Sequence, residues 1–199
     1  MPRNRPRRST RQRRPNRTNL ALVVALAVAP PCFITGCGDA DGPYETSVAR
    51  SPAPAVSLDA AIVQGDDEAV RAHILAGTPI DTPNASGDTP LSLASVFGRA
   101  YACRVLIDAG ADLESRNNSG TTPLFNAAFF CHPEIVRMLI EAGADTETTD
   151  ANGVSIASIM ETPWAQIEPV YAAVYGAIGI PLDTEQIRSI RPEIAAMLR

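Results

Sequence analysis

The chain has 199 residues, enough for one modest domain, and its 45% hydrophobic and 20% charged residues are ordinary for a soluble protein. Its charge is uneven: all 17 cationic residues are arginine, eight of them lie within residues 1–17, and no acidic residue precedes Asp39. From residue 37 onward, nine arginines stand against all 22 acidic residues, which gives that part a formal charge of −13. This negative charge argues against nucleic acid and anionic lipid surfaces as partners, because both attract Lys and Arg. It favours a basic partner.

Residues 1–36 are predicted to be a signal peptide. Residues 1–19 are basic, and residues 20–29 (LALVVALAVA) form a continuous apolar run of ten. A basic start, a short apolar run and small residues near the cut are typical of secretory signals. The run is too short for a permanent membrane span, which needs about 20 apolar residues.

Residues 34–37 (ITGC) resemble the lipobox of bacterial lipoproteins, in which the signal is cut before a lipidated cysteine. Gly36 supplies the small residue before the cut, and Cys37 is the predicted lipidation site. The resemblance implies a lipoprotein anchored in the cell envelope, facing the periplasm or the exterior, that touches the membrane only through its lipid. Two alternatives stay open: a plain signal peptide, which would make the protein secreted, and a basic arm that is never cut.

Residues 37–56 are predicted to be a disordered tether. They are rich in Gly, Pro, Ala, Ser and Asp and contain few large apolar residues. Such a segment would let an anchored domain stand clear of the bilayer.

Residues 84–117 and 117–150 repeat one another at a shift of 33, which is typical of a repeat solenoid. The sequence ThrProLeu recurs at 89–91 and 122–124, with threonine where a helix N-cap belongs and proline at the first helical position. Gly110 and Gly143 recur where a second, apolar helix should end. A single pair of short helices cannot bury its apolar faces, so the pairs must stack.

ThrProLeu, an Ala-rich helix, a second apolar helix and AlaGlyAlaAsp together resemble the ankyrin repeat. The resemblance implies an all-α solenoid of about four helix-turn-helix units over residues 57–180, with the first and last degenerate. Residues 181–199 are then expected to be a C-terminal capping helix.

Several local expectations follow from this alignment. Ser57 or Asp59 should cap the first helix, while Pro163 and Pro169 should interrupt the fourth unit and Pro192 should kink or restart the last helix. The family usually has histidine after ThrProLeu, where this chain has Ser92 and Phe125. In the family this histidine forms a hydrogen bond with the threonine. Serine can form such a bond in its place but phenylalanine cannot, so a looser turn is expected in the unit of Phe125.

In ankyrin proteins the first helices and the turn tips line a concave groove, so the resemblance implies that this protein binds another protein there. Aromatic residues gather on the predicted first helices, and aromatic anchors dominate interface energies. The aromatic candidates are Phe97, Phe125, Phe129, Phe130 and Trp164, and the turn-tip candidates are Asn84, Ser86, Asp88, Asn117, Ser119, Thr121, Asn152 and Val154. The alternative, that the rings pack between layers or under the last unit, stays open.

The sequence offers little catalytic chemistry. His73 aligns with core positions of the later units, and the neighbours Cys131 and His132 are the one pair that suggests a thiol enzyme. A disulfide between Cys103 and Cys131 stays open as an alternative, because the oxidising compartment that the signal peptide implies would permit it. We expect no cofactor, no metal and no enzyme activity, and a monomer that binds protein; a thiol enzyme and a purely structural envelope protein remain the alternatives.

Overall fold

The computed structural model describes residues 54–199. The predicted signal peptide, the lipidation site Cys37 and nearly all of the predicted tether lie outside the described residues. Between residues 54 and 199 no helix is both long enough and apolar enough to cross a membrane.

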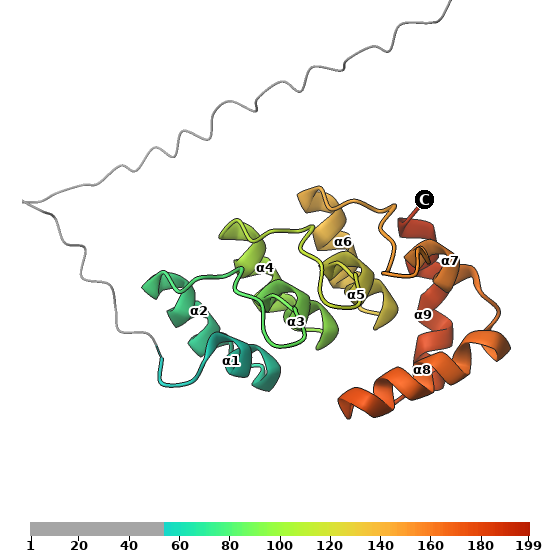
Figure 1. The fold of residues 1–199 in the computed structure, drawn as a ribbon, viewed down its shortest axis with the longest axis horizontal. Helices are drawn as coiled ribbons and strands as arrows, with labels where there is room; N and C mark the ends of the chain where they lie inside the picture. Colours follow the sequence, from blue (N-terminus) through green and yellow to red (C-terminus); the bar gives the residue numbers. More distant parts are fainter. Residues whose placement is uncertain (1–53) are drawn as a thin grey trace, which may run out of the picture. The chain divides into compact units, whose positions relative to one another are not determined.

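The described part of the chain forms helices and a single isolated bridge between Thr149 and Ser155. The helices are α1 (Leu58–Gln64), α2 (Asp67–Ala76), α3 (Pro90–Val96), α4 (Ala100–Asp108), α5 (Pro123–Phe129), α6 (Pro133–Ala142), α7 (Ile156–Glu161), α8 (Trp164–Ile178) and α9 (Thr184–Met197). Helices α1, α3, α5 and α7 pack in one row, and α2, α4, α6 and α9 pack in a second row beside it (Figure 1). The prediction of an all-α repeat solenoid is confirmed.

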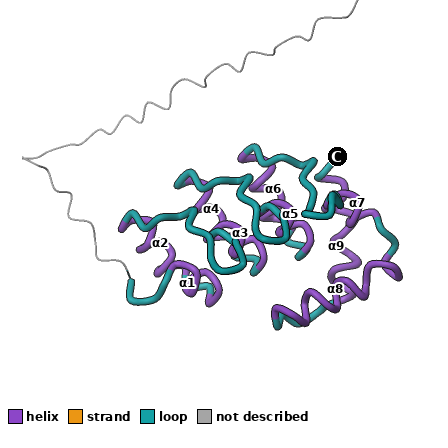
Figure 2. The backbone as a smooth tube through the Cα atoms, viewed as in Figure 1, coloured by secondary structure: helices purple, strands orange, loops and turns teal. Residues whose placement is uncertain are grey.

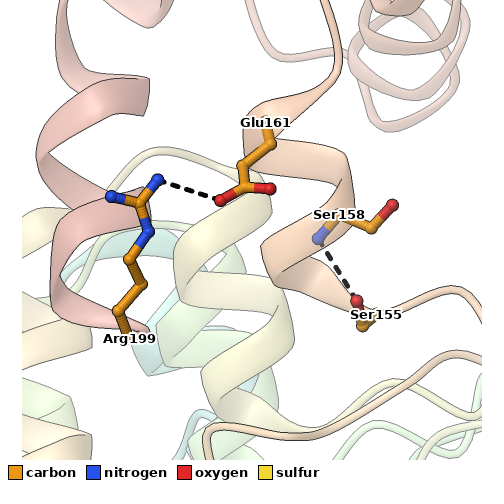
Figure 3. A network of polar contacts seen from close by, with 4 residues as sticks. All are labelled: Ser155, Ser158, Glu161 and Arg199. Carbon is orange, nitrogen blue, oxygen red and sulfur yellow. Dashed lines mark hydrogen bonds and ion pairs between the residues drawn. The ribbon is translucent and has the colours of Figure 1, made fainter.

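Each helix of the first row begins at a hydroxyl cap. The Thr122 side chain accepts a hydrogen bond from the Phe125 backbone N–H at 3.2 Å, and Thr89 occupies the same position one repeat earlier. Ser57 and Ser155 cap α1 and α7 in the same way; Figure 3 shows the bond from the Ser158 N–H to Ser155. Each such cap contributes about 1 kcal/mol to helix stability.

The turns before these helices are braced by one side chain at a fixed place. The Asn117 side-chain oxygen accepts hydrogen bonds from the N–H groups of Ser119 and Thr121, at 3.0 and 3.1 Å. Asn84 and Asp150 do the same in the neighbouring turns. The turn of the Phe125 unit is therefore not looser than the others, because an asparagine side chain supplies the bracing.

Neighbouring turns are also joined to one another. The Asn118 N–H donates to the Ser86 carbonyl at 3.0 Å, and the Ala151 N–H donates to the Ser119 carbonyl at 2.9 Å. Gly120 is needed here, since it has φ +74° and an added Cβ would lie 2.6 Å from the Ala151 nitrogen. These turns, drawn in teal in Figure 2, form a rigid edge along one side of the array.

The fourth unit departs from the repeat. Helix α7 packs against α9, and α9 also packs against α6, so α9 takes the place that the second helix has in the earlier units. The sequence predicts a C-terminal capping helix, and α9 closes the end of the stack by filling the last place of the second row. Helix α8 lies outside both rows, on the side of α3 and α5 that faces away from α4 and α6 (Figure 1).

As expected, Pro163 interrupts the fourth unit between α7 and α8, whereas Pro169 does not end α8 and α9 does not restart at Pro192. Pro163 is the N-cap of α8, while Pro169 and Pro192 lie inside α8 and α9, which continue past them. A proline removes one helical hydrogen bond, but Tyr171 and Arg191 are buried next to these sites and hold each helix in place. The chain end is joined to α7 by an ion pair 2.9 Å long between Arg199 and Glu161 (Figure 3).

Candidate interaction groove

The concave side of the array contains a cavity of about 530 Å³, bounded by α3, α5, the turn edge and α8. Most of the residues predicted to bind a partner line it. They are Phe97, Phe125, Phe129, Phe130, Asn84, Ser86, Asp88, Asn117, Ser119 and Thr121. Trp164, Asn152 and Val154 do not line it. Residues that were singled out from different repeats of the sequence therefore line one surface.

Five further residues line the cavity that the sequence analysis did not single out: Leu93, Val96, Asn126, Val174 and Ile178. Leu93 and Asn126 occupy the same position in successive repeats, so the period of 33 was a usable signal for them. Val174 and Ile178 belong to α8. The repeat gives no signal for these two, because α8 lies outside both rows.

Helix α8 covers part of the aromatic surface. The ring of Phe129 stacks on that of Tyr171 at 4.7 Å between centroids and 9° between planes, and Phe130 lies 5.2 Å from Tyr175. Phe129 and Phe130 are 7% and 8% exposed, whereas Phe97 is half-buried. The alternative that rings pack under the last unit thus describes Phe129 and Phe130, and Phe97 is the most accessible phenylalanine between residues 54 and 199.

Trp164 belongs to a different cluster. Its ring lies 5.6 Å from Tyr171 and 5.9 Å from the Arg191 guanidinium. Buried Arg191 also donates to the Thr162 carbonyl at 2.7 Å, beyond the end of α7. Trp164 therefore helps to fix α8 and α9 on α7 and is not a groove residue.

The C-terminal ends of the first-row helices are capped from the next layer. Arg99 donates to the Val63 carbonyl at 2.6 Å, and His132, one period later, donates from Nε2 to the Val96 carbonyl at 3.1 Å. In the third unit this task falls to Tyr175, whose hydroxyl donates to the Phe130 carbonyl at 3.3 Å. His132 is thereby a structural residue, and burial lowers its pKa against the opposing effect of its bond to Val96.

The neighbouring Cys131 and His132 lack the features of a thiol enzyme. Burial raises the pKa of Cys131 to about 11, so the nucleophilic thiolate is scarce at neutral pH. The His132 ring is engaged with the Val96 carbonyl and cannot serve as a free base from that nitrogen. This geometry disfavours the thiol-enzyme alternative.

Cys103 and Cys131 are both free and buried, so the disulfide considered from the sequence is not formed. The Cys103 sulfur lies 3.9 Å from the Ser95 hydroxyl, within its own unit. The Cys131 sulfur lies 3.8 Å from the Phe129 carbonyl. Burial is the main cause that raises the pKa of Cys103 to about 12. Each thiol is therefore a small buried core group.

His73 is buried, as its alignment with core positions predicted. Its Nε2 bonds to the Val56 carbonyl at 2.8 Å, and its Nδ1 lies 3.0 Å from the Thr78 hydroxyl. It thus fastens the start of the described chain to α2. Across residues 54–199, no three His, Cys, Asp or Glu side chains come together in a way that would hold a metal ion.

A directed chain of hydrogen bonds runs along the groove wall from one repeat to the next. Asp88 accepts from the Ser92 hydroxyl at 2.8 Å and from the Asn117 amide at 2.7 Å. Ser92 in turn accepts from the Asn126 amide nitrogen at 2.8 Å. An ionised carboxylate only accepts, so it fixes the direction of every bond in the chain.

This series of hydrogen bonds ends at the acidic residue Asp88, and a second acidic residue near Asp88, Asp59, lies outside the cavity lining. Burial raises the pKa of Asp59, and the nearby Asp88 carboxylate raises it further. Within residues 54–199 the ion pairs are Arg137–Glu193 and Arg199–Glu161, so neither Asp59 nor Asp88 has a cationic partner there.

Residues 58–150 match the family model described as Ankyrin repeats (3 copies). No curated protein matches the chain. The match spans the three regular helix pairs, α1 to α6, and ends before α7, where α8 leaves the rows. Residues 58–150 thus match ankyrin repeats, and such repeats indicate a protein-interaction module.

Proposed function

We propose that this protein binds another protein through its concave face and turn tips, and that it is held at the cell envelope as a lipoprotein. The observation that carries the first part is the cavity of about 530 Å³, which is lined by residues from two adjacent repeats and the turn edge. The turn edge is braced by side chains and joined from unit to unit. A partner would meet a preformed surface, which lowers the ordering cost of binding.

The charge of the body favours a basic partner. From residue 37 onward, nine arginines stand against 22 acidic residues, and complementary charge raises association rates and rejects acidic competitors. Asp88 lines the cavity and brings part of that charge to the groove.

The envelope location is supported by the sequence of the leader. Residues 34–37 (ITGC) follow a basic segment and a short apolar run, which is the order found in a lipoprotein signal. The multiple acyl chains of a bacterial lipoprotein would anchor it stably, whereas one chain holds only marginally. The Pro- and Gly-rich residues that follow would let the repeat domain reach a partner away from the bilayer.

Affinity capture from an envelope extract tests the binding function. We expect the wild-type chain to retain a partner and Phe97→Asp to lose it, because Phe97 lines the cavity and is only half-buried. Tyr101→Asp is the matched control: Tyr101 is 39% exposed on the second-row helix α4 and does not line the groove. Circular dichroism of both variants checks that they fold.

Unchanged capture by Phe97→Asp would favour a purely structural envelope protein. Anchoring has a separate test, fractionation of cells that express Cys37→Ser. We expect this variant to leave the membrane fraction; retention there would contradict the lipoprotein proposal.

A further inference from the structure

The cavity has an apolar part and a polar part. Rings and aliphatic side chains make up most of the lining: Phe97, Leu93 and Val96 come from α3 and its end, and Val174 and Ile178 come from α8. Polar atoms enter from the turn edge, through Asp88 and its neighbours. A ligand that fills this space must therefore be apolar over much of its surface and polar at one side.

Asn126 adds a specific acceptor on the α5 side of the cavity. Its side chain is 6% exposed and lines the cavity, and its amide nitrogen is engaged with Ser92. The carboxylate of Asp88 fixes the Ser92 hydroxyl, so the amide cannot turn over without breaking this bond. No donor among residues 54–199 reaches the Asn126 oxygen, which is left for a donor from a ligand.

Asp88 adds a negative charge to the polar side of the cavity. Both donors to Asp88 are neutral groups, from Ser92 and Asn117, so its negative charge is oriented but not cancelled. Burial is the larger cause that raises the pKa of Asp59, and the Asp88 carboxylate raises it further, so the two acidic groups repel one another. A cation placed at Asp88 would relieve this repulsion and form a charge-assisted hydrogen bond.

Resting on the proposed binding function, we infer that the groove takes a peptide segment with a bulky apolar side chain next to an arginine or lysine. The apolar side chain fills the cavity between Phe97 and α8. The cation bonds to Asp88, and a donor of the same segment bonds to the Asn126 oxygen. The partner's recognised segment is thus both apolar and basic.

Selection from a random peptide display library, with the full chain immobilised, tests this chemistry. We expect enriched peptides in which Phe, Trp, Leu or Met stands within a few residues of Arg or Lys. In a synthetic copy of an enriched peptide, Arg→Gln should weaken binding about tenfold, the order expected for loss of a charge-assisted bond. This comparison leaves the protein unchanged, so it does not depend on any variant folding.

Two protein variants locate the charge. Asp88→Asn keeps an acceptor for Ser92 and Asn117 and should bind the Arg and Gln peptides about equally, since the tenfold preference comes from the carboxylate. Glu141→Gln, which removes an exposed acid from the second-row helix α6, should keep the full preference.

The outcomes separate this inference from the binding function itself. Enriched peptides that are acidic or purely apolar, or an Asp88→Asn chain that keeps the preference for Arg, would overturn the inference and leave a groove with a partner of other chemistry. If the chain enriches no peptide and also captures nothing from envelope extract, the binding function fails together with the inference. If it enriches no peptide but captures a partner that Phe97→Asp loses, the inference alone fails.

Discussion

Two tyrosines four residues apart on α8 should respond with opposite sign to the same substitution. The Tyr175 hydroxyl donates to the Phe130 carbonyl at 3.3 Å. The Tyr171 hydroxyl is buried and has no hydrogen-bond partner among the described residues. Replacement by phenylalanine keeps both rings, and with them the stack on Phe129 and the contact with Phe130, so it reports on the hydroxyl groups alone.

The structure sets the size of each effect. The bond of Tyr175 is long for a hydroxyl donor, so its loss should cost about 0.5–1 kcal/mol, the lower part of the usual range for a hydrogen bond. An unsatisfied buried polar group costs about 1–3 kcal/mol. The Cys131 thiol lies beside the Tyr171 hydroxyl and offsets part of that cost. We therefore expect Tyr171→Phe to stabilise the fold by about 1 kcal/mol.

Urea unfolding of the two variants and the wild type measures both effects. The midpoint should rise for Tyr171→Phe and fall for Tyr175→Phe, with an unchanged slope, since neither change alters the surface exposed on unfolding. Tyr101→Phe on the exposed side of α4 is the control and should stay within about 0.5 kcal/mol of the wild type. A lower midpoint for Tyr171→Phe would refute the reasoning that its hydroxyl is unsatisfied.

Three further predictions concern the layer contacts. Gly98→Ala should destabilise by about 1–3 kcal/mol in thermal unfolding, because the site has φ +67° and the new Cβ would lie 2.7 Å from the His132 ring; Gly176→Ala in α8, which meets nothing within 4 Å, should not. The pKa of His132 is lower in the folded chain than in the unfolded chain, so as pH falls below 6.5 the unfolded chain takes up a proton at His132 more readily and the wild type should lose stability. His132→Gln lacks this group and should lose less stability in unfolding measured between pH 7 and 5. With Cys32 and Cys37 replaced by serine, the two remaining thiols should react slowly with a disulfide reagent at pH 8 and rapidly in denaturant, and a native chain without free thiols would contradict the structure.

The sequence predicted the regular part of the fold because the same local signals recur there. A threonine cap, a proline at the first helical position and a glycine at the end determine where each helix starts and stops, and the period of 33 aligns the units. Once the units are aligned, residues such as Phe97 and Phe130 must lie on the same side of the array. This is why the groove was found from residues that are far apart in the chain.

The later helices could not be predicted in this way, because long-range packing decides their places. Both α8 and α9 follow α7 and contain good helix formers, so local signals do not tell which one fills the second row. Arg191 decides it: its buried guanidinium caps the end of α7 and lies over the Trp164 ring, which fixes α9 beside α7. Helix α8 is then free to turn Tyr171 and Tyr175 toward the first-row helices.

The displacement of α8 changes what the groove can bind. In a regular fourth unit, the rings of Phe129 and Phe130 would extend the concave surface; here α8 lies over them, and Val174 and Ile178 become part of the cavity wall. The accessible part of the groove is therefore shortened toward Phe97 and the acidic end at Asp88. A short segment that carries an apolar group and a cation matches this remaining surface better than a long apolar helix, which would first have to displace α8 and expose the buried rings to water.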